Sequence, residues 1–171
     1  IGVDNLNNYY SKKLKLDRLK DISKLKLKEK YFKFYRLDLE NLKKIEKIFL
    51  NYKFDTVIHL AAQAGVRYSL ENPRAYLKSN VISFFNILDL CKKFKIKHLI
   101  YASTSSVYGN NQIPYSEQTN SDKPLQFYSA TKKTNEVMAY AYSNLYKFKT
   151  TGLRFFTVYG PWGRPCLLYT S

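Results

Sequence analysis

The chain has 171 residues, of which 45% are apolar and 16% aromatic, so it is long and apolar enough for one folded domain and is not a disordered segment. Its net charge of +16 is typical of proteins that bind polyanions. However, the lysines between Ser11 and Lys33 alternate with leucines, as on a solvated helix face, and we expect no specific nucleic-acid partner. No apolar run reaches the roughly 18–20 residues that cross a bilayer, so we expect no membrane span.

The two cysteines, Cys91 and Cys166, form neither a C-x-x-C pair nor a metal-ligand cluster with His59 or His98. We therefore expect no metal site, and a reducing cytoplasm is the compartment that fits. The sequence opens with Ile1 and runs directly into Gly2-Val-Asp4, which has the pattern of the end of a strand whose beginning is missing. We expect the chain to be a fragment of a longer protein.

The first third alternates between strand and helix patterns. A short apolar strand ends at Asp4, residues 9–22 have helical spacing, residues 31–39 alternate as a strand, and residues 40–52 carry the apolar stripe of a helix. An acidic residue at the tip of a strand is where a dinucleotide-binding fold holds a ribose. Asp and Asn also favour turns and helix caps, so Asp4 alone does not establish such a site.

The middle of the chain continues the alternation. An apolar run at 54–60 predicts a buried parallel strand, and it leads into a loop of small residues at 61–67, where a ligand can approach the backbone. His59 in that strand is predicted to be a core residue and not a catalyst. A long helix is predicted from Asn72 to Phe94, with Pro73 in its first turn.

The last third places hydroxyl groups after a strand. The strand predicted at 97–102 ends in Ser103-Thr-Ser-Ser106, and open α/β sheets bind ligands at the carboxyl ends of their strands. A polar loop at 110–127, a helix at 128–146 and a strand at 150–158 follow. Strands that alternate with helical crossovers predict a doubly wound, Rossmann-like parallel sheet of the α/β class.

Tyr128 and Lys132 are four residues apart on the last predicted helix, so their Cβ atoms lie about 5–6 Å apart on one face. The ammonium group can hold the phenol ionised, which a general base at neutral pH requires because a free tyrosine titrates near 10. A Tyr-x-x-x-Lys also arises by chance in a chain with 16 tyrosines. Two residues on a solvated helix face are therefore the alternative.

Several motifs in chain order make the sequence resemble the extended short-chain dehydrogenase/reductase family, specifically its NAD-dependent nucleotide-sugar epimerases and dehydratases and, among these, the UDP-glucuronate 4-epimerases. The motifs are Asp4-Asn-Leu-Asn7, Asp38-Leu39, His59-Leu-Ala-Ala-Gln-Ala-Gly-Val-Arg-Tyr-Ser69, Tyr101-Ala-Ser-Thr-Ser-Ser-Val-Tyr-Gly109, Tyr128-x-x-x-Lys132 and Leu153-Arg-Phe-Phe-Thr-Val-Tyr-Gly-Pro-Trp-Gly-Arg-Pro165. The resemblance implies a partial NAD-binding Rossmann domain over residues 1–165. Residues 166–171 do not follow the family pattern and form an atypical tail.

The resemblance implies NAD-dependent epimerisation at C4 of a UDP-sugar, UDP-glucuronate to UDP-galacturonate, through a 4-keto intermediate. Tyr128 would be the base, Lys132 would lower the pKa of its phenol, and Thr104 would hydrogen-bond the sugar oxygen. The implied NAD contacts lie at the strand ends and around these three residues: Asp4, Asn5, Asn7, Asp38, Leu39, Leu60, Ala61, Ala62, Gln63, Ser79, Ser103, Tyr128, Lys132 and Phe156. The implied substrate contacts are Arg67, Thr104, Ser105, Ser106, Thr157 and Arg164. The family also implies a homodimer through the helices near 76–94 and 128–146.

Two parts of the family pattern lie outside this sequence: the first βα unit, with its glycine-rich pyrophosphate loop, and the C-terminal substrate domain. We therefore expect the complete protein to be an enzyme and this polypeptide by itself to be inactive. The alternatives are a UDP-glucose 4-epimerase, a nucleotide-sugar 4,6-dehydratase or decarboxylase, and a basic Rossmann-type RNA-binding protein. A dehydratase needs an acid/base pair where Ser105 and Ser106 stand, and the basic residues are not grouped with stacking aromatic residues as RNA binding requires.

Overall fold

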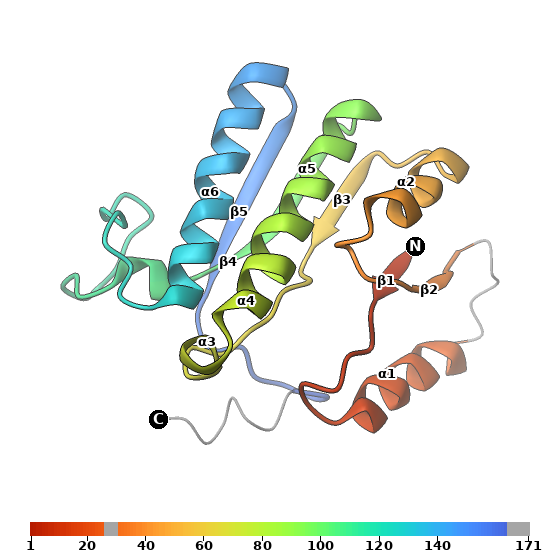
Figure 1. Ribbon diagram of the computed structural model, residues 1–171, viewed down its shortest axis with the longest axis horizontal. Coiled ribbons are helices and arrows are strands. Elements are labelled where there is room, and N and C mark those ends of the chain that lie inside the picture. Colours follow the sequence, from red (N-terminus) through yellow and green to blue (C-terminus); the bar gives the residue numbers. More distant parts are fainter. Residues whose placement is uncertain (26–30, 164–171) are drawn as a thin grey trace. The chain divides into compact units, whose positions relative to one another are not determined.

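A computed structural model describes residues 1–25 and 31–163, and it confirms an α/β fold built on parallel strands (Figure 1). The chain forms two compact units, one made of residues 1–38 and 157–171 and the other of residues 39–156. Arg164 and the tail at 166–171, both singled out in the sequence, lie outside the described residues.

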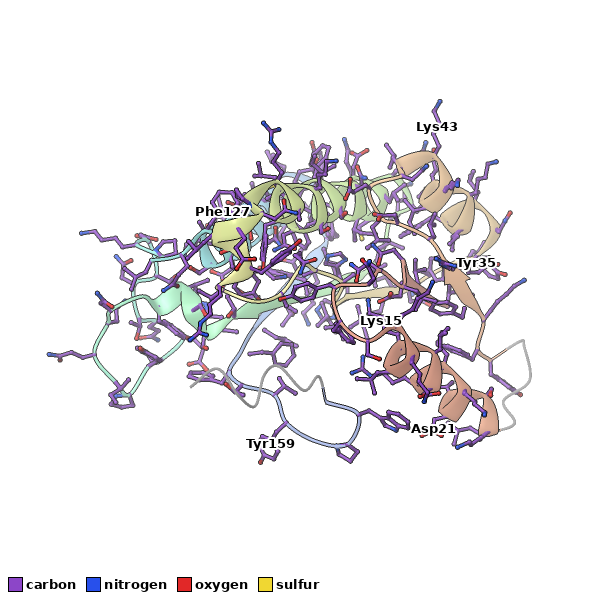
Figure 2. The ribbon with its side chains drawn as sticks, turned by 60° about the horizontal axis from the view of Figure 1, so that its bottom comes forward. Lys15, Asp21, Tyr35, Lys43, Phe127 and Tyr159 are labelled. Atoms are coloured by element: carbon purple, nitrogen blue, oxygen red, sulfur yellow. The ribbon has the colours of Figure 1, made fainter. Side chains whose placement is uncertain are left out.

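The first unit contains a parallel strand pair and one helix. Strand β1 (Gly2–Asp4) pairs with β2 (Phe34–Arg36), with Asp4 opposite Arg36 at the carboxyl ends. Helix α1 (Lys12–Lys24) begins after Ser11, whose side chain accepts a hydrogen bond from the backbone of Leu14 and caps the helix. Lys15, labelled in Figure 2, is buried although α1 is otherwise a basic, solvated helix.

The second unit is organised on a sheet of three parallel strands in the order β3-β4-β5. Strands β3 (Thr56–His59), β4 (His98–Thr104) and β5 (Lys149–Phe155) are aligned so that the carboxyl end of β4, at Thr104, lies opposite Phe155. Gly152 of β5 allows a close approach, because a Cβ there would lie 2.6 Å from the hydroxyl oxygen of Tyr101. The ring of Tyr101 therefore packs directly over the backbone of Gly152, where a residue with a Cβ atom would not fit.

Helices cover this sheet. Helix α2 (Leu42–Asn51) precedes β3, and α3 (Tyr68–Glu71), α4 (Pro73–Tyr76), the π-helix η1 (Leu77–Ile82) and α5 (Ser83–Lys93) connect β3 to β4. The 3-10 helix η2 (Ser105–Tyr108) follows β4, and α6 (Phe127–Tyr146) leads to β5. Helices α5 and α6 pack side by side on one face of the sheet (Figure 1). Their inner faces bury Phe84, Leu88 and Ala139, which have no exposed surface.

The structure confirms the predicted order of strands and helices and corrects one element. The helix expected from Asn72 to Phe94 is interrupted by the π-helical turn η1, where Ser83 Oγ donates to the backbone oxygen of Lys78, five residues earlier, at 3.2 Å. Such turns are rare and occur often at functional sites. In the part of the chain that the structure describes, no helix is long and apolar enough to span a membrane.

Candidate active site

Tyr128 and Lys132 lie in the first turns of α6. The helix begins where Ser129 Oγ accepts a hydrogen bond from the backbone N–H of Gln126 at 3.2 Å. Tyr128 is half-buried, and its ring meets the ring of Tyr76 edge to face with centroids 6.0 Å apart. Lys132 is only 1% exposed, and its Nζ donates to the backbone oxygen of Ala102 at 2.9 Å. The lysine therefore joins the first turns of α6 to the last residues of β4.

The surroundings of Lys132 give its charge a strong local effect. Burial lowers the pKa of its ammonium group to about 8. The group is still protonated at neutral pH, but it lies where water cannot screen it. A cation in a weakly polarisable environment stabilises an anion formed beside it far more than a surface lysine does. Tyr128 lies one turn earlier on the same helix, and its role as the group that carries such an anion stays a prediction.

Thr104 is the last residue of β4 and is also buried. Its Oγ1 accepts a hydrogen bond from the backbone N–H of Ser106 at 3.2 Å and so caps η2, which packs against α6. Gly109 ends this turn with a φ of +60°, and a Cβ there would lie 2.7 Å from the backbone oxygen of Lys123. Only glycine suits both this φ angle and this short distance. The direction in which the chain leaves the turn of Ser105 and Ser106 is therefore fixed.

Asn80 ties the loop after β3 to the turn that carries Tyr128. Its Oδ1 accepts from the backbone N–H of Gln63 at 2.7 Å, and its Nδ2 donates to the backbone oxygen of Gln63 and to Thr131 Oγ1, each at 3.1 Å. Thr131 Oγ1 in turn donates to the backbone oxygen of Tyr128 at 2.7 Å. The sequence analysis selected the neighbouring Ser79 and missed Asn80. The available signal was a polar residue at a position where the helical spacing places the buried Tyr76 and Phe84 on the same face.

His59 is a core residue, as predicted. Its ring lies against that of Phe84 with centroids 5.4 Å apart, and its Nε2 is buried without a hydrogen-bond partner among the described residues. Burial, followed by the nearby charge of Lys132, lowers the pKa of the imidazole to about 3. The ring is therefore neutral at every pH at which the protein would work.

The predicted ribose contacts of the first unit form a connected group at the end of β1. Asp4 Oδ1 accepts from the backbone N–H of Leu6 at 2.6 Å, and Asn5 Nδ2 donates to Asp38 Oδ2 at 2.9 Å. Lys15 Nζ donates to Asn7 Oδ1 at 2.8 Å. These bonds orient the side chains, and a carboxylate such as that of Asp4 is an acceptor of the type that suits the hydroxyls of a ribose.

The other predicted contacts are more scattered. The backbone oxygen of Leu39 accepts from Asn86 Nδ2 at 2.8 Å. Leu60 and Phe156 are exposed, as are Arg67 and Thr157, whereas a further group is half-buried: Ala61, Ala62, Ser79, Ser105 and Ser106. Ser103 is buried and donates through Oγ to Glu136. The contacts predicted for these residues stay predictions.

Taken separately, each of the two units carries groups of the types that a dinucleotide binds. The first unit offers the carboxylate of Asp4 for the hydroxyls of one ribose. The second unit offers the buried ammonium of Lys132 for those of another, and a loop of small residues after β3 whose backbone is held by Asn80. Carboxylate acceptors, a cation and an accessible backbone are the donor and acceptor types that such a cofactor uses.

Comparison with known proteins identifies the family. Residues 3–169 match the NAD dependent epimerase/dehydratase family. The chain is 56% identical over 166 residues to Protein CapI of Staphylococcus aureus, covering 96% of this chain and 48% of that protein. It is 47% identical over 165 residues to the UDP-glucuronate 4-epimerase of Thermodesulfobacterium geofontis, covering 96% of this chain and 50% of that protein. The chain thus spans about half the length of the curated relatives it matches.

Solved structures agree with the sequence match. The UDP-glucuronic acid 4-epimerase from Bacillus cereus, in complex with UDP-glucuronic acid and NAD, has a TM-score of 0.84 at 34% identity and covers 96% of this chain and 50% of its own. The UDP-glucose 4-epimerase of Thermus thermophilus, in complex with NAD, has a TM-score of 0.73 at 32% identity and covers 77% of this chain and 43% of its own. With its parallel strands, buried Lys132 and matching motifs, the chain belongs to the NAD-dependent epimerase/dehydratase family.

Proposed function

We propose that the complete protein carrying this chain inverts C4 of a UDP-sugar, with UDP-glucuronate and UDP-galacturonate as the interconverted pair and NAD as the cofactor. The observation that carries the proposal is Lys132, a buried lysine one helical turn from Tyr128 and joined to the strand that ends in Thr104. Relatives at 44–47% identity that are named UDP-glucuronate 4-epimerase support the choice of substrate.

The protein's part in the reaction is to move a proton and to hold charge. NAD, when bound, would supply the hydride chemistry at C4, taking up and returning two electrons with the hydrogen of that carbon. The Tyr128 phenolate takes the proton from the 4-hydroxyl and later gives it back, while the Lys132 ammonium stabilises the phenolate. The hydroxyl of Thr104 donates a hydrogen bond to the same sugar oxygen and so stabilises the charge that develops there.

Other contacts follow from the family resemblance and belong to this proposal. Lys132 would also hold the nicotinamide ribose, and Asp4, Asn5 and Asn7 the adenosine ribose. Arg67, Arg164 or both would face the carboxylate or the diphosphate of the substrate, because a guanidinium binds either anion with paired hydrogen bonds. We further propose that the protein forms a homodimer. We also propose that it is cytoplasmic, because the free, buried thiol of Cys91 is in keeping with a reducing compartment.

A UDP-glucose 4-epimerase is the second candidate, because solved epimerases of that specificity share the fold. A 4,6-dehydratase is less well supported, since the two residues after Thr104 are serines, whose hydroxyls do not supply the acid and base that an elimination needs. The two epimerase reactions use the same proton and charge transfers at C4, so only the substrate distinguishes them.

The test uses the complete protein. We expect it to convert UDP-glucuronate to UDP-galacturonate, followed by chromatography, and Tyr128→Phe to lower kcat by about 10²–10⁴-fold because the base is lost. Tyr31→Phe is the matched control, since Tyr31 precedes β2 and is 67% exposed; it should keep the parental rate. If the protein turned over UDP-glucose and not UDP-glucuronate, the proposed mechanism at C4 would stand and the proposed substrate would be wrong. A parent that turns over no nucleotide sugar would contradict the proposal.

A further inference from the structure

Glu136 is the centre of a polar cluster beside the candidate active site. It lies on α6 one turn after Lys132, and its carboxylate accepts hydrogen bonds from two other elements. Ser103 Oγ on β4 donates to Oε1 at 2.6 Å, and Arg154 on β5 donates through Nε to Oε1 at 2.9 Å and through Nη2 to Oε2 at 3.0 Å. Paired hydrogen bonds from a guanidinium to a carboxylate are among the strongest polar contacts in proteins.

The cluster also fixes the long loop between η2 and α6. Arg154 lies opposite Ser103 in the sheet, and it reaches the loop through Nη2, which donates to Ser121 Oγ at 3.0 Å. Lys133 Nζ donates to the same Ser121 Oγ at 2.7 Å. The guanidinium carbon of Arg154 lies 4.8 Å from the ring centroid of Tyr108, the last residue of η2. One carboxylate thus connects α6, β4, β5 and the loop that leads to Tyr128.

The charges in this cluster compensate each other. Burial by itself would raise the pKa of Glu136, but the hydrogen bonds from Arg154 and Ser103 outweigh it and lower that pKa below its ordinary value. The hydrogen bonds that Arg154 donates to Glu136 raise the pKa of Arg154. The pair is therefore ionised on both sides. Removing Arg154 takes away the paired hydrogen bonds of Glu136 and leaves its carboxylate the more distant Lys133 Nζ, at 3.6 Å, and removing Glu136 takes away the carboxylate that pairs with Arg154.

We infer that Glu136 and Arg154 are positioning residues for the C4 reaction, because they hold the face of α6 that carries Tyr128 and Lys132 against the strand that carries Thr104. The inference rests on the proposed function. Tyr128 and Thr104 come from different elements, yet both must reach one sugar oxygen within about 2.6–3.2 Å. The bond between Glu136 and Ser103 joins those elements one residue from Thr104 and one turn from Lys132.

A displacement of about 1 Å at a reacting group costs about 10²-fold in rate. In the complete protein, we therefore expect Glu136→Gln and Arg154→Lys each to lower kcat by about 10–100-fold. The KM for the UDP-sugar and the amount of bound NAD should stay within about twofold, because the binding groups are intact. The double variant should cost no more than the worse single variant, since the two side chains act as a unit.

Glu46→Gln is the matched control. Glu46 of α2 pairs with Lys93 of α5, away from Tyr128 and Thr104, and its loss should leave kcat unchanged. A second readout does not depend on activity. Hydrogen exchange of the backbone amides at 103–108 and 126–132 should become at least about tenfold faster in Glu136→Gln and stay parental in Glu46→Gln.

The outcomes separate the two proposals. Parental kcat or unchanged exchange in Glu136→Gln and Arg154→Lys would overturn the positioning role, and the comparison of the parent with Tyr128→Phe would still report on the epimerase reaction. A fall in melting temperature with parental kcat would show a purely structural pair and would also overturn it. If the parent turned over no UDP-sugar, the proposed function would fail, and unchanged exchange at 103–108 and 126–132 would overturn the positioning role as well.

Discussion

Lys132 shows at the scale of one residue how a functional charge works against stability. The side chain is almost completely buried, and its one hydrogen bond within residues 1–25 and 31–163 goes to the backbone oxygen of Ala102. Burial without a carboxylate partner is a poor environment for an ammonium group, as its lowered pKa reflects. A residue of that kind is retained for what its charge does, because an apolar side chain of similar length would suit the same space better.

Lys132→Met should therefore stabilise the fold while it abolishes activity. The pKa falls from 10.5 in the unfolded chain to about 8 in the folded protein, so below about pH 8 the buried charge disfavours folding. Urea unfolding near neutral pH should show a gain of about 1–3 kcal/mol in the free energy of unfolding. The gain should shrink as the pH rises through the interval between those two values, where the folded wild-type protein has lost its proton and the unfolded chain still holds one.

The control for this change is Lys43→Met on α2. Lys43 is exposed and extends into solvent (Figure 2), so its replacement should move the free energy of unfolding by at most about 0.5 kcal/mol. A Lys132→Met protein that is less stable than wild type near neutral pH would contradict this expectation, because the buried ammonium group would then stabilise the fold.

His59 makes the fold sensitive to acid. The folded protein keeps this imidazole neutral down to about pH 3, whereas the unfolded chain binds a proton near 6.5. Between these values the unfolded state binds more protons, so stability should fall as the pH drops, by about 1.4 kcal/mol per pH unit from this one group. His59→Leu should flatten that slope in urea unfolding between about pH 6.5 and pH 5, and His98→Gln, which leaves His59 in place, should not.

At the scale of elements, periodicity predicted most of the fold. The helix expected at 128–146 is α6, Phe127–Tyr146, and the strand expected at 97–102 is β4, His98–Thr104. Helical and strand spacing are local, so they are visible in sequence. The π turn η1 is not visible in the sequence, because it goes with a long-range contact, the hydrogen bond between Asn80 and the backbone of the loop after β3. The pairing of Glu136 with Arg154 also depends on which residues of β4 and β5 lie opposite each other.

The π turn gives a direct comparison of neighbouring residues. Asn80→Ala leaves the buried backbone N–H of Gln63 without its acceptor, so it should lower the free energy of unfolding by about 1–3 kcal/mol and loosen the retention of NAD. Ser79→Ala should change stability by at most about 0.5 kcal/mol. Urea unfolding and the NAD content of the purified complete protein measure the two effects. If Ser79→Ala alone loses NAD at full stability, Ser79 is the cofactor contact that the sequence analysis predicted.

At the scale of the whole molecule, the outer face of α5 and α6 is unusually apolar. Ile82 at the end of η1, Phe85 on α5, and Val137 and Tyr140 on α6 are at least 45% exposed, although α5 and α6 lie side by side (Figure 1). Apolar patches of this kind mark protein–protein interfaces. A second copy of the chain meeting the same face is the occupant that gives a closed, two-fold interface, in agreement with the proposed homodimer.

Charge predicts how such a dimer should respond to salt. Two copies of this chain, each with a formal charge of +16, repel each other, and the contact itself is apolar. Salt screens the repulsion and leaves the apolar contact intact, so sedimentation should show tighter association as ionic strength rises. An interface held by ion pairs would loosen instead.

Phe85→Glu combined with Val137→Glu should give a monomer, because burying two carboxylates in each half is unfavourable. Leu50→Glu, at an exposed apolar residue of α2, should remain dimeric. A complete protein that sediments as a monomer at every concentration would contradict the role of this face.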